Sequence, residues 1–398
     1  MTPTLSTKAA FFCIAYAFLV AMAGTTLPTP LYPIYQARFG FGELLITVIF
    51  ATYAVGVIIG LILTGRLSDE IGRRKVLMFG LACAIGSTIL FLVAEGVAPM
   101  LVARLLSGFT AGAFAGTATA MMLDLAPGGR RELAAGIAVA VNLGGLGCGT
   151  LLSGALAQTG TDPLRLSYWV YLALLVPAVL AVLFAPETVQ PREHPRFAPQ
   201  QLAVPPEVRG TFTRAALGGF SAFTISGLFG AVGPLFLGKY LGYHSHLLAG
   251  FIVFILFLAS ATSSLVLPRI GNRTALVGGA VAVVLSSCLL ILALETESLA
   301  VMFVCGISCG IGQGLAVGAG LAALGAETPA DRRGEVSATF FVVLYVALAV
   351  PIVAVGLLSQ AIELRPAGVV ISALAIALGS AGAISLIARE REPVSGAS

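Results

Sequence analysis

Long apolar runs follow one another along this chain, separated by short polar connections. Each run is close to the roughly 20 residues that a helix needs to cross the hydrocarbon core of a bilayer. Only 10% of the residues are charged, and the mean hydropathy is +1.01. A soluble domain carries roughly 25% charged residues, and one as apolar as this would aggregate through exposed patches. The sequence therefore predicts an all-α membrane protein.

Twelve such runs can be placed. We expect membrane spans at 9–33, 43–65, 75–94, 98–124, 133–157, 166–185, 213–238, 246–267, 274–294, 299–324, 336–360 and 367–388. The first run continues past Pro28 and Pro30 without a small-residue cleavage site, so we interpret it as a span and not as a removable signal. The one long connection is rich in Pro and charge. It predicts three parts: a six-helix bundle at 1–185, a cytoplasmic linker at 186–212 and a second six-helix bundle at 213–398.

The basic residues indicate the orientation in the membrane, because Lys and Arg gather in cytoplasmic loops. If the N-terminus is inside, 17 of the 22 Lys and Arg residues fall in inner segments and 4 in outer segments. The outer ones are Arg38, Arg165, Lys239 and Arg365. This bias predicts a multi-pass protein of the cell inner (cytoplasmic) membrane with both termini in the cytoplasm.

The two predicted halves share a sequence pattern at an offset of 202 residues. The glycines 108, 112 and 116 recur at 310, 314 and 318, and Pro127 with its two following arginines recurs at Pro329. The glycine at 40 recurs at 242. Duplicated halves are typical of carriers that rock two bundles about a site near the middle of the membrane.

Several classes of function are disfavoured. The net charge of +4 is small and its basic residues are scattered, so we expect no nucleic-acid partner. The six cysteines lie in apolar stretches without a histidine cluster, which argues against a metal site or a disulfide framework. A polytopic enzyme would need a His, Asp and Glu cluster at one membrane face, and a sensor would normally carry a sizeable soluble domain. We expect a monomeric transporter without a cofactor, whose partners are a small-molecule substrate and the lipid bilayer.

The loop between the second and third spans runs from Gly65 to Lys75 as GRLSDEIGRRK. It resembles the signature loop of the major facilitator superfamily, which implies twelve transmembrane helices in two pseudo-symmetric bundles. In that family the loop's aspartate and basic residues latch the two halves at the cytoplasmic side. The resemblance assigns a cytoplasmic gate to Gly65, Asp69, Gly72, Arg73, Arg74 and Asp124. The alternative is that these charges only fix the topology. The second-half counterpart, 268–273, lacks the acid.

Arg104 lies inside the fourth span, four residues before Gly108. This pair resembles a second motif of the family. An arginine is costly in hydrocarbon, so proton coupling or binding of an anionic group are its functional interpretations. The alternative is an arginine whose head group snorkels to the outer interface. Its repeat mate is Gly306, so the charge belongs to the first half alone.

The fifth span contains a glycine series that resembles the antiporter motif of the drug:proton antiporter (drug efflux) branch. Thr150 and Ser153 depart from that motif, which has Pro and Gly there. The alternative is a seam for close helix packing, as we also expect in the fourth span. The glycines of both motifs are Gly108, Gly112, Gly145, Gly149 and Gly154.

In the family fold, the first, fourth, seventh and tenth spans line the cavity, and nearby spans can add residues. The candidates for substrate contact are Tyr16, Thr25, Thr26, Tyr32, Tyr35, Asn142, Thr224, Ser226, Gln313 and Tyr345. Each could instead make an ordinary contact between helices. The single tryptophan is expected in the outer interfacial belt, so the cavity should be mainly apolar and suit a hydrophobic or amphipathic substrate.

No Asp or Glu lies centrally within a predicted span, although proton-driven carriers often place one there. The remaining candidates for coupling are Asp69, Arg104 and Asp124. Our hypothesis is proton-coupled efflux of hydrophobic small molecules, powered by a proton gradient. An uptake carrier or an uncoupled facilitator of a small metabolite remains the alternative.

Overall fold

The computed structural model describes residues 6–159, 162–194, 198–329 and 332–388. All regular elements within these ranges are helical. The longer helices are α1 (Thr7–Thr26), α3 (Glu43–Thr64), α5 (Arg73–Leu92), α6 (Val97–Asp124), α7 (Arg131–Thr159), α8 (Pro163–Phe184), α9 (Arg209–Lys239), α10 (His246–Ile270), α11 (Asn272–Thr296), α12 (Leu299–Glu327), α13 (Arg333–Ile362) and α14 (Leu364–Ala388). Short helices are η1 (Thr29–Leu31), α2 (Tyr32–Phe39), α4 (Leu67–Ile71), η2 (Pro127–Gly129) and η3 (Pro206–Val208).

Twelve helical segments within the described residues are long and apolar enough to cross a membrane. Each overlaps one predicted span, so the predicted twelve-helix fold is confirmed. The first segment is not a single helix. Pro28 and Pro30 lack the N–H group that a continuing helix needs, so α1 ends and the chain resumes as η1 and α2 up to Phe39.

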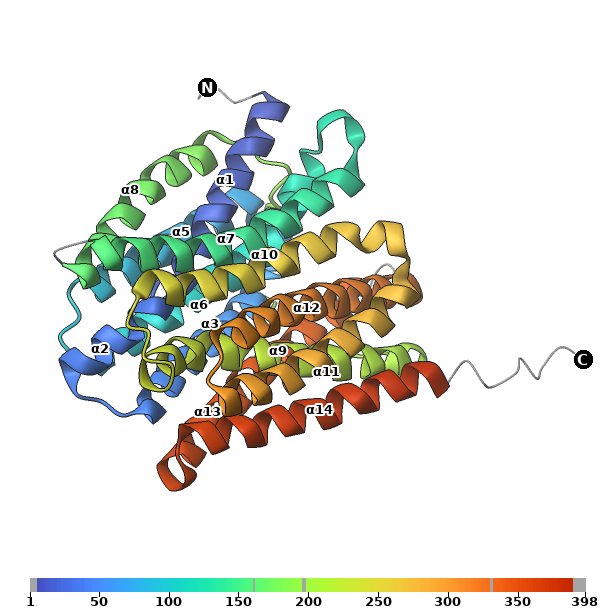
Figure 1. Ribbon diagram of the computed structural model, residues 1–398. Coiled ribbons are helices and arrows are strands. Elements are labelled where there is room, and N and C mark those ends of the chain that lie inside the picture. Colours follow the sequence, from blue (N-terminus) through green and yellow to red (C-terminus); the bar gives the residue numbers. More distant parts are fainter. Residues whose placement is uncertain (1–5, 160–161, 195–197, 330–331, 389–398) are drawn as a thin grey trace, which may run out of the picture.

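The helices form two groups in chain order. In Figure 1 the first six spans, blue to green, occupy the upper left, and the last six, yellow-green to red, occupy the lower right. The turn at 127–130 and the described parts of the connection between α8 and α9, residues 186–194 and 198–208, lie at one end of the bundle, here called the linker end. The turns at 40–42 and 240–245 lie at the opposite end, here called the far end.

Glycines allow two helix pairs to approach closely, one pair in each half. A Cβ added to Gly108 or Gly112 of α6 would collide with the α3 backbone at Tyr53 or Val57. Their repeat mates on α12 face α10, where a Cβ at Gly310 would collide with the Leu256 carbonyl. The 202-residue repeat therefore corresponds to the same close helix contact in both halves.

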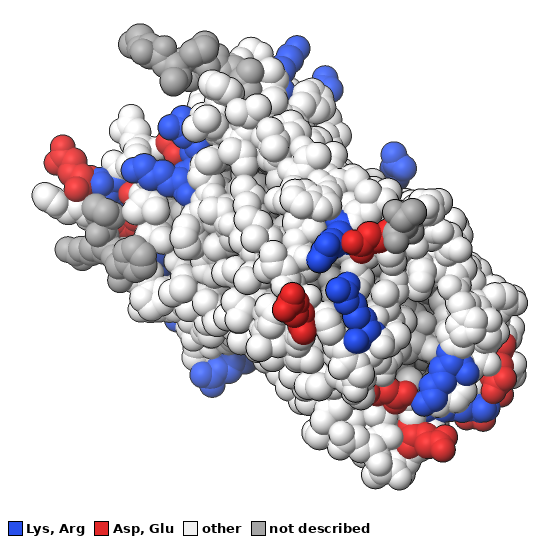
Figure 2. All heavy atoms as spheres, turned by 90° about the vertical axis from the view of Figure 1, so that its left-hand side faces the viewer, with Lys and Arg blue, Asp and Glu red and all other residues white. Residues whose placement is uncertain are grey.

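Two helix pairs make most of the contact between the halves, α3 with α13 and α7 with α10. The α7–α10 contact again depends on glycine, because a Cβ at Gly250 would collide with the Thr150 carbonyl. Gly154 packs against the His246 carbonyl in the same seam, and Thr150 Oγ1 donates to the Gly250 carbonyl over 3.1 Å. The outer surface of the bundle is mainly apolar. Figure 2 views the molecule from the left-hand side of Figure 1 and shows charged side chains in small groups of both signs on a broad uncharged surface.

Candidate functional site

The predicted gate loop is built by two breaks in the helix. The α3 helix ends at Thr64, the short α4 follows, and Gly72 separates α4 from α5. Gly72 has a φ of 103°, which a residue with a Cβ rarely adopts. This reversal places Arg73 as the first residue of α5, with its side chain turned towards α6.

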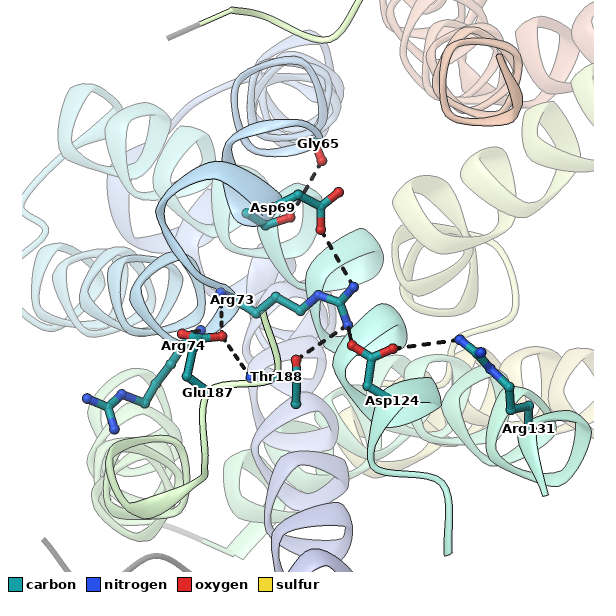
Figure 3. Close-up of polar contacts among 9 residues, drawn as sticks. Gly65, Asp69, Arg73, Arg74, Asp124, Arg131, Glu187 and Thr188 are labelled. Atoms are coloured by element: carbon teal, nitrogen blue, oxygen red, sulfur yellow. Dashed lines mark hydrogen bonds and ion pairs between the residues drawn. The ribbon is translucent and has the colours of Figure 1, made fainter. Parts of the chain in front are cut away.

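Arg73 is the centre of the gate network (Figure 3). Its guanidinium forms a close ion pair with Asp124 at the end of α6 and lies 3.6 Å from Asp69 of α4. Asp124 also lies 3.7 Å from Arg131 at the start of α7. The structure thus brings Asp69, Arg73 and Asp124 together, as the sequence predicted. All three belong to the first half, so this network joins helices of one bundle.

Glu187 is a residue of this network that the sequence analysis missed. Its carboxylate accepts the backbone N–H groups of Arg73, at 2.9 Å, and Arg74, at 3.1 Å. A carboxylate at this position caps the first turn of α5 and meets the positive end of its dipole. Glu187 lies at the start of the connection between α8 and α9, here called the connecting segment. Its carboxylate therefore joins this segment to the gate loop. The acid in the Pro186–Thr188 sequence was the only available signal.

The other predicted gate residues lie at the edge of the network. Arg74 points away from Asp69 and donates to the Leu183 carbonyl over 3.3 Å. The Gly65 carbonyl accepts the Ser68 hydroxyl at 3.5 Å, and Gln200 packs against Gly65.

The connecting segment also binds the gate loop through its own polar groups. Arg192 forms a 2.8 Å ion pair with Glu70, and its backbone N–H donates to the Glu70 carbonyl over 2.9 Å. Further along, the Gln200 N–H donates to the Ile62 carbonyl of α3 over 2.7 Å. Thr339 of α13 contacts the Ala203 carbonyl over 3.4 Å. This segment therefore contacts both halves at the linker end.

Polar contacts join the two halves at both ends of the bundle. At the linker end, Arg66 after α3 forms a 2.9 Å ion pair with Glu335 of α13, whose exposed fraction is only 8%. At the far end, Lys239 of α9 forms a 2.8 Å ion pair with Glu43 of α3. Gln158 of α7 accepts the backbone N–H of His246 at 2.9 Å and the Ser245 hydroxyl at 3.2 Å.

Arg104 is fully enclosed, with an exposed fraction of 1%. Its Nη1 donates to the Thr25 carbonyl at the end of α1 over 2.5 Å. The guanidinium carbon lies 4.9 Å from the ring centre of Tyr53, 5.6 Å from that of Phe50 and 5.9 Å from that of Tyr32. This side chain does not reach an outer surface, so the snorkelling alternative does not describe it.

Six of the predicted cavity residues use their polar groups in contacts between or within helices. Thr25 Oγ1 bonds the Met22 carbonyl, Thr26 Oγ1 bonds the Leu146 carbonyl, and Tyr16 donates to the Leu174 carbonyl; the remaining pairs are Tyr35 with Tyr168, Thr224 with the Ala347 carbonyl, and Ser226 with Cys309. The other four are less committed. Tyr32 Oη, Asn142 Oδ1 and Gln313 Oε1 are buried without a hydrogen-bond partner. Tyr345 lies between the halves, 6.3 Å from Tyr53, measured between ring centres.

Sequence comparison identifies the family. The model of the Major Facilitator Superfamily matches residues 14–350, and a second match covers 215–396. The chain belongs to the major facilitator superfamily. It is therefore a multi-pass membrane protein of a transporter family, which points to transport and not to catalysis. Among the described residues, no group of three or more His, Cys, Asp or Glu side chains could hold a metal ion.

The relatives in this superfamily include one named as an exporter. The cephamycin export protein of Amycolatopsis lactamdurans is 31% identical over 197 residues, which is 49% of this chain and 39% of that protein. An uncharacterised transporter of the superfamily from Mycobacterium tuberculosis strain H37Rv is 27% identical over 183 residues, covering 46% and 25%. The superfamily transporter traF of Penicillium crustosum is 28% identical over 206 residues, covering 51% and 42%. The chain thus spans less than half the length of these curated relatives.

Solved structures show the same fold. The crystal structure of the human organic anion transporter MFSD10 (TETRAN) superimposes with a TM-score of 0.68, covering 96% of this chain and 100% of that one at 17% identity. At this identity the likeness concerns the superfamily fold alone.

Proposed function

We propose that this superfamily member is a proton-coupled exporter of small hydrophobic or amphipathic molecules that works by alternating access. In this proposal it resides in the cell inner membrane with both termini in the cytoplasm, so the linker end is cytoplasmic. The observation that carries the proposal is the distribution of contacts in the two repeated halves. Glycine seams fix α3 on α6 and α10 on α12 within each half, and between the halves α3 packs on α13 and α7 on α10, with one ion pair at each end of the bundle.

Such an arrangement allows the bundles to rock as units. The far-end ion pair involves an exposed lysine and contributes only about 0–1 kcal/mol. The linker-end ion pair is likewise a single contact, so either end can open without disrupting a half. The ion pair of Arg66 with Glu335 would close the linker end, and that of Lys239 with Glu43 would close the far end. Alternation between the two closures is the motion expected of a carrier with duplicated halves.

Two observations support export. The cephamycin export protein is 31% identical to half of this chain. The glycine series of α7 also makes close contacts, because a Cβ at Gly149 would collide with the Ala23 carbonyl of α1 and one at Gly154 would approach the α10 backbone. We propose that this seam guides α7 between α1 and α10, in keeping with the antiporter motif that it resembles.

The coupling role is proposed for the carboxylates at the linker end. Asp124 pairs with Arg73 and Arg131, so protonating it would weaken the contacts between α6, α5 and α7. Glu335 is the better-enclosed carboxylate and pairs across the halves with Arg66, with Arg332 at 3.5 Å. Protonation of Glu335 would release the linker end, so we add it to the candidates Asp69, Arg104 and Asp124.

Transport in sealed inverted vesicles tests this proposal, with cephamycin and a hydrophobic dye as trial substrates. We expect uptake that requires a pH gradient with an acidic vesicle interior, and that stops when this gradient is collapsed. Glu335→Gln should retain binding but lose the dependence on the gradient. Glu95→Gln is the control, because Glu95 is exposed at the far end. Uptake that survives collapse of the gradient would refute proton coupling, and would favour the facilitator alternative.

A further inference from the structure

The charge of Arg104 has no carboxylate partner among the described residues. Its guanidinium contacts one backbone carbonyl and three aromatic rings. A buried charge without a counter-ion is costly, and arginines inside a membrane generally pair or serve a binding site. Because only 1% of Arg104 is exposed, water at the surface of the molecule does not solvate its charge.

The existing contacts compensate the charge only in part. The Thr25 carbonyl belongs to the last turn of α1, where the break before Pro28 leaves helical carbonyls without a following turn. The negative end of the helix dipole contributes about half a charge there. Arg104 Nε and Tyr32 Oη are both buried, and the tyrosine hydroxyl interacts with the guanidinium but has no further hydrogen-bond partner. A guanidinium N–H and the adjacent tyrosine hydroxyl can therefore both donate to an anion.

The second half lacks this arrangement. The residue that corresponds to Arg104 is Gly306, and the Phe229 ring fills the space that a side chain would need there, 3.0 Å from an added Cβ. The guanidinium is thus a feature of one half only. An asymmetric charge between two otherwise repeated bundles is what recognition of one end of a ligand requires.

A row of aromatic rings leads from Arg104 towards the linker end. Tyr53 lies beside the guanidinium, Tyr345 of the second half is 6.3 Å from Tyr53, and Phe223 is 5.8 Å from Tyr345, measured between ring centres. At 1.5 Å per residue, Arg104 is about 10 Å from the far end of its helix, and Tyr345 is about 25 Å from the far end of α13. Tyr345 and Phe223 are only half-buried. Phe50 also contacts the second half, because its ring lies 3.6 Å from a Cβ placed on Gly230.

We propose that Arg104 and Tyr32 bind the carboxylate of an amphipathic organic anion, whose apolar body lies along Tyr53, Tyr345 and Phe223. This inference rests on the proposed transport function and names the class of its substrate. Arg–carboxylate hydrogen bonds are charge-assisted and stronger than neutral ones, and aromatic faces pack against an apolar ring. Because the rings come from both halves, a bound ligand would bridge α3 of one bundle and α9 and α13 of the other.

A matched pair of probes tests the site on the purified full-length protein in detergent. The probes are 2-naphthoate and its neutral amide, 2-naphthamide, with dissociation constants measured by calorimetry in the absence of a pH gradient. Wild type should bind the carboxylate about ten- to a hundred-fold more tightly than the amide, the range expected for hydrogen bonds to a charged group. Arg104→Gln should abolish this preference and leave amide binding unchanged.

Three further variants separate binding from structural effects. Tyr32→Phe should weaken carboxylate binding several-fold, and it remains informative if Arg104→Gln does not fold. Tyr345→Ala should weaken both probes alike. Arg365→Gln should change neither, because Arg365 pairs with Glu295 and Glu297 at the far end.

Equal affinity of wild type for the two probes would overturn the proposal, as would failure of both to bind or an unchanged preference in Arg104→Gln. The binding readout needs no gradient. If transport did not depend on the pH gradient but wild type still preferred the carboxylate probe, only proton coupling would be refuted. If transport depended on the gradient but wild type bound both probes equally, only the anion site would be refuted.

Discussion

The close contact of α6 with α3 predicts opposite effects for two identical substitutions on one helix. Gly108 and Gly116 are both helical residues of α6. A Cβ at Gly108 would collide with the Tyr53 carbonyl, whereas a Cβ at Gly116 would have no heavy atom within 4 Å. Gly108→Ala and Gly116→Ala therefore differ in packing while they share the intrinsic helix effect.

The magnitudes follow from these two terms. Replacing a helical glycine by alanine stabilises a protein by roughly 0.5–1 kcal/mol through the helix preference alone. Overpacking costs typically about 1–3 kcal/mol, and at Gly108 the obstacle is backbone, which cannot turn aside as a side chain does. The shared helix term cancels, so the two variants should differ by about 1–3 kcal/mol in free energy of unfolding. Gly108→Ala should be the less stable of the two and Gly116→Ala at least as stable as wild type.

Reversible unfolding of the detergent-solubilised protein in a sodium dodecyl sulfate titration measures this difference. Thermal unfolding gives an independent ranking of the stabilities of wild type, Gly108→Ala and Gly116→Ala. If Gly108→Ala were as stable as Gly116→Ala, the α3–α6 seam would not be the close contact that we describe, and the rigidity of each half would lose its main support.

Three other variants test the gate. Gly72→Ala places a Cβ at a φ of 103° and within 2.6 Å of the Glu187 carboxylate, so thermal unfolding should show a loss of about 1–3 kcal/mol. Glu187→Gln removes the charge and one acceptor at the start of α5, at a cost of about 1 kcal/mol; amide hydrogen exchange at Arg73 should quicken, with Glu193→Gln as the unaffected control. Glu335→Gln weakens the link to Arg66 by about 1–2 kcal/mol, and spin-label distances across the linker end should shift towards open forms by roughly ten-fold in population.

The twelve-helix fold could be predicted because each span must satisfy the same requirement for length and apolarity. Helix ends were less predictable, since α1 continues through η1 into α2 and α9 begins at Arg209, before the apolar run. The 202-residue glycine repeat was visible in the sequence. Its physical cause, the paired contacts of α6 with α3 and α12 with α10, required the structure.

The gate was predictable where motif residues bond to one another and not where distant segments join them. The grouping of Asp69, Arg73 and Asp124 agreed with the prediction, but Glu187 arrives from the connecting segment, whose path the motif does not specify. The hydrogen-bond partners of hydroxyl groups in the predicted cavity were also not predictable from the sequence. Thr26 bonds a carbonyl of α7, because a helical environment offers backbone acceptors nearby that a sequence pattern does not reveal.

The central claim is that the two bundles alternate between closure at the far end and closure at the linker end. Pulsed electron paramagnetic resonance can measure the distance between two spin labels at each end. Each pair of labels is introduced into a cysteine-free variant of the protein. The far-end pair is Ala37 with Ile362, and the linker-end pair is Arg130 with Thr274; all four positions are exposed.

The perturbation is Lys239→Gln, which breaks the far-end ion pair with Glu43. Because both ion pairs are formed together in the structure, the account predicts that the Ala37–Ile362 distance lengthens in part of the population while the Arg130–Thr274 distance does not lengthen in that part. If both distances lengthened together, or if the Ala37–Ile362 distance did not change, alternating access would be contradicted.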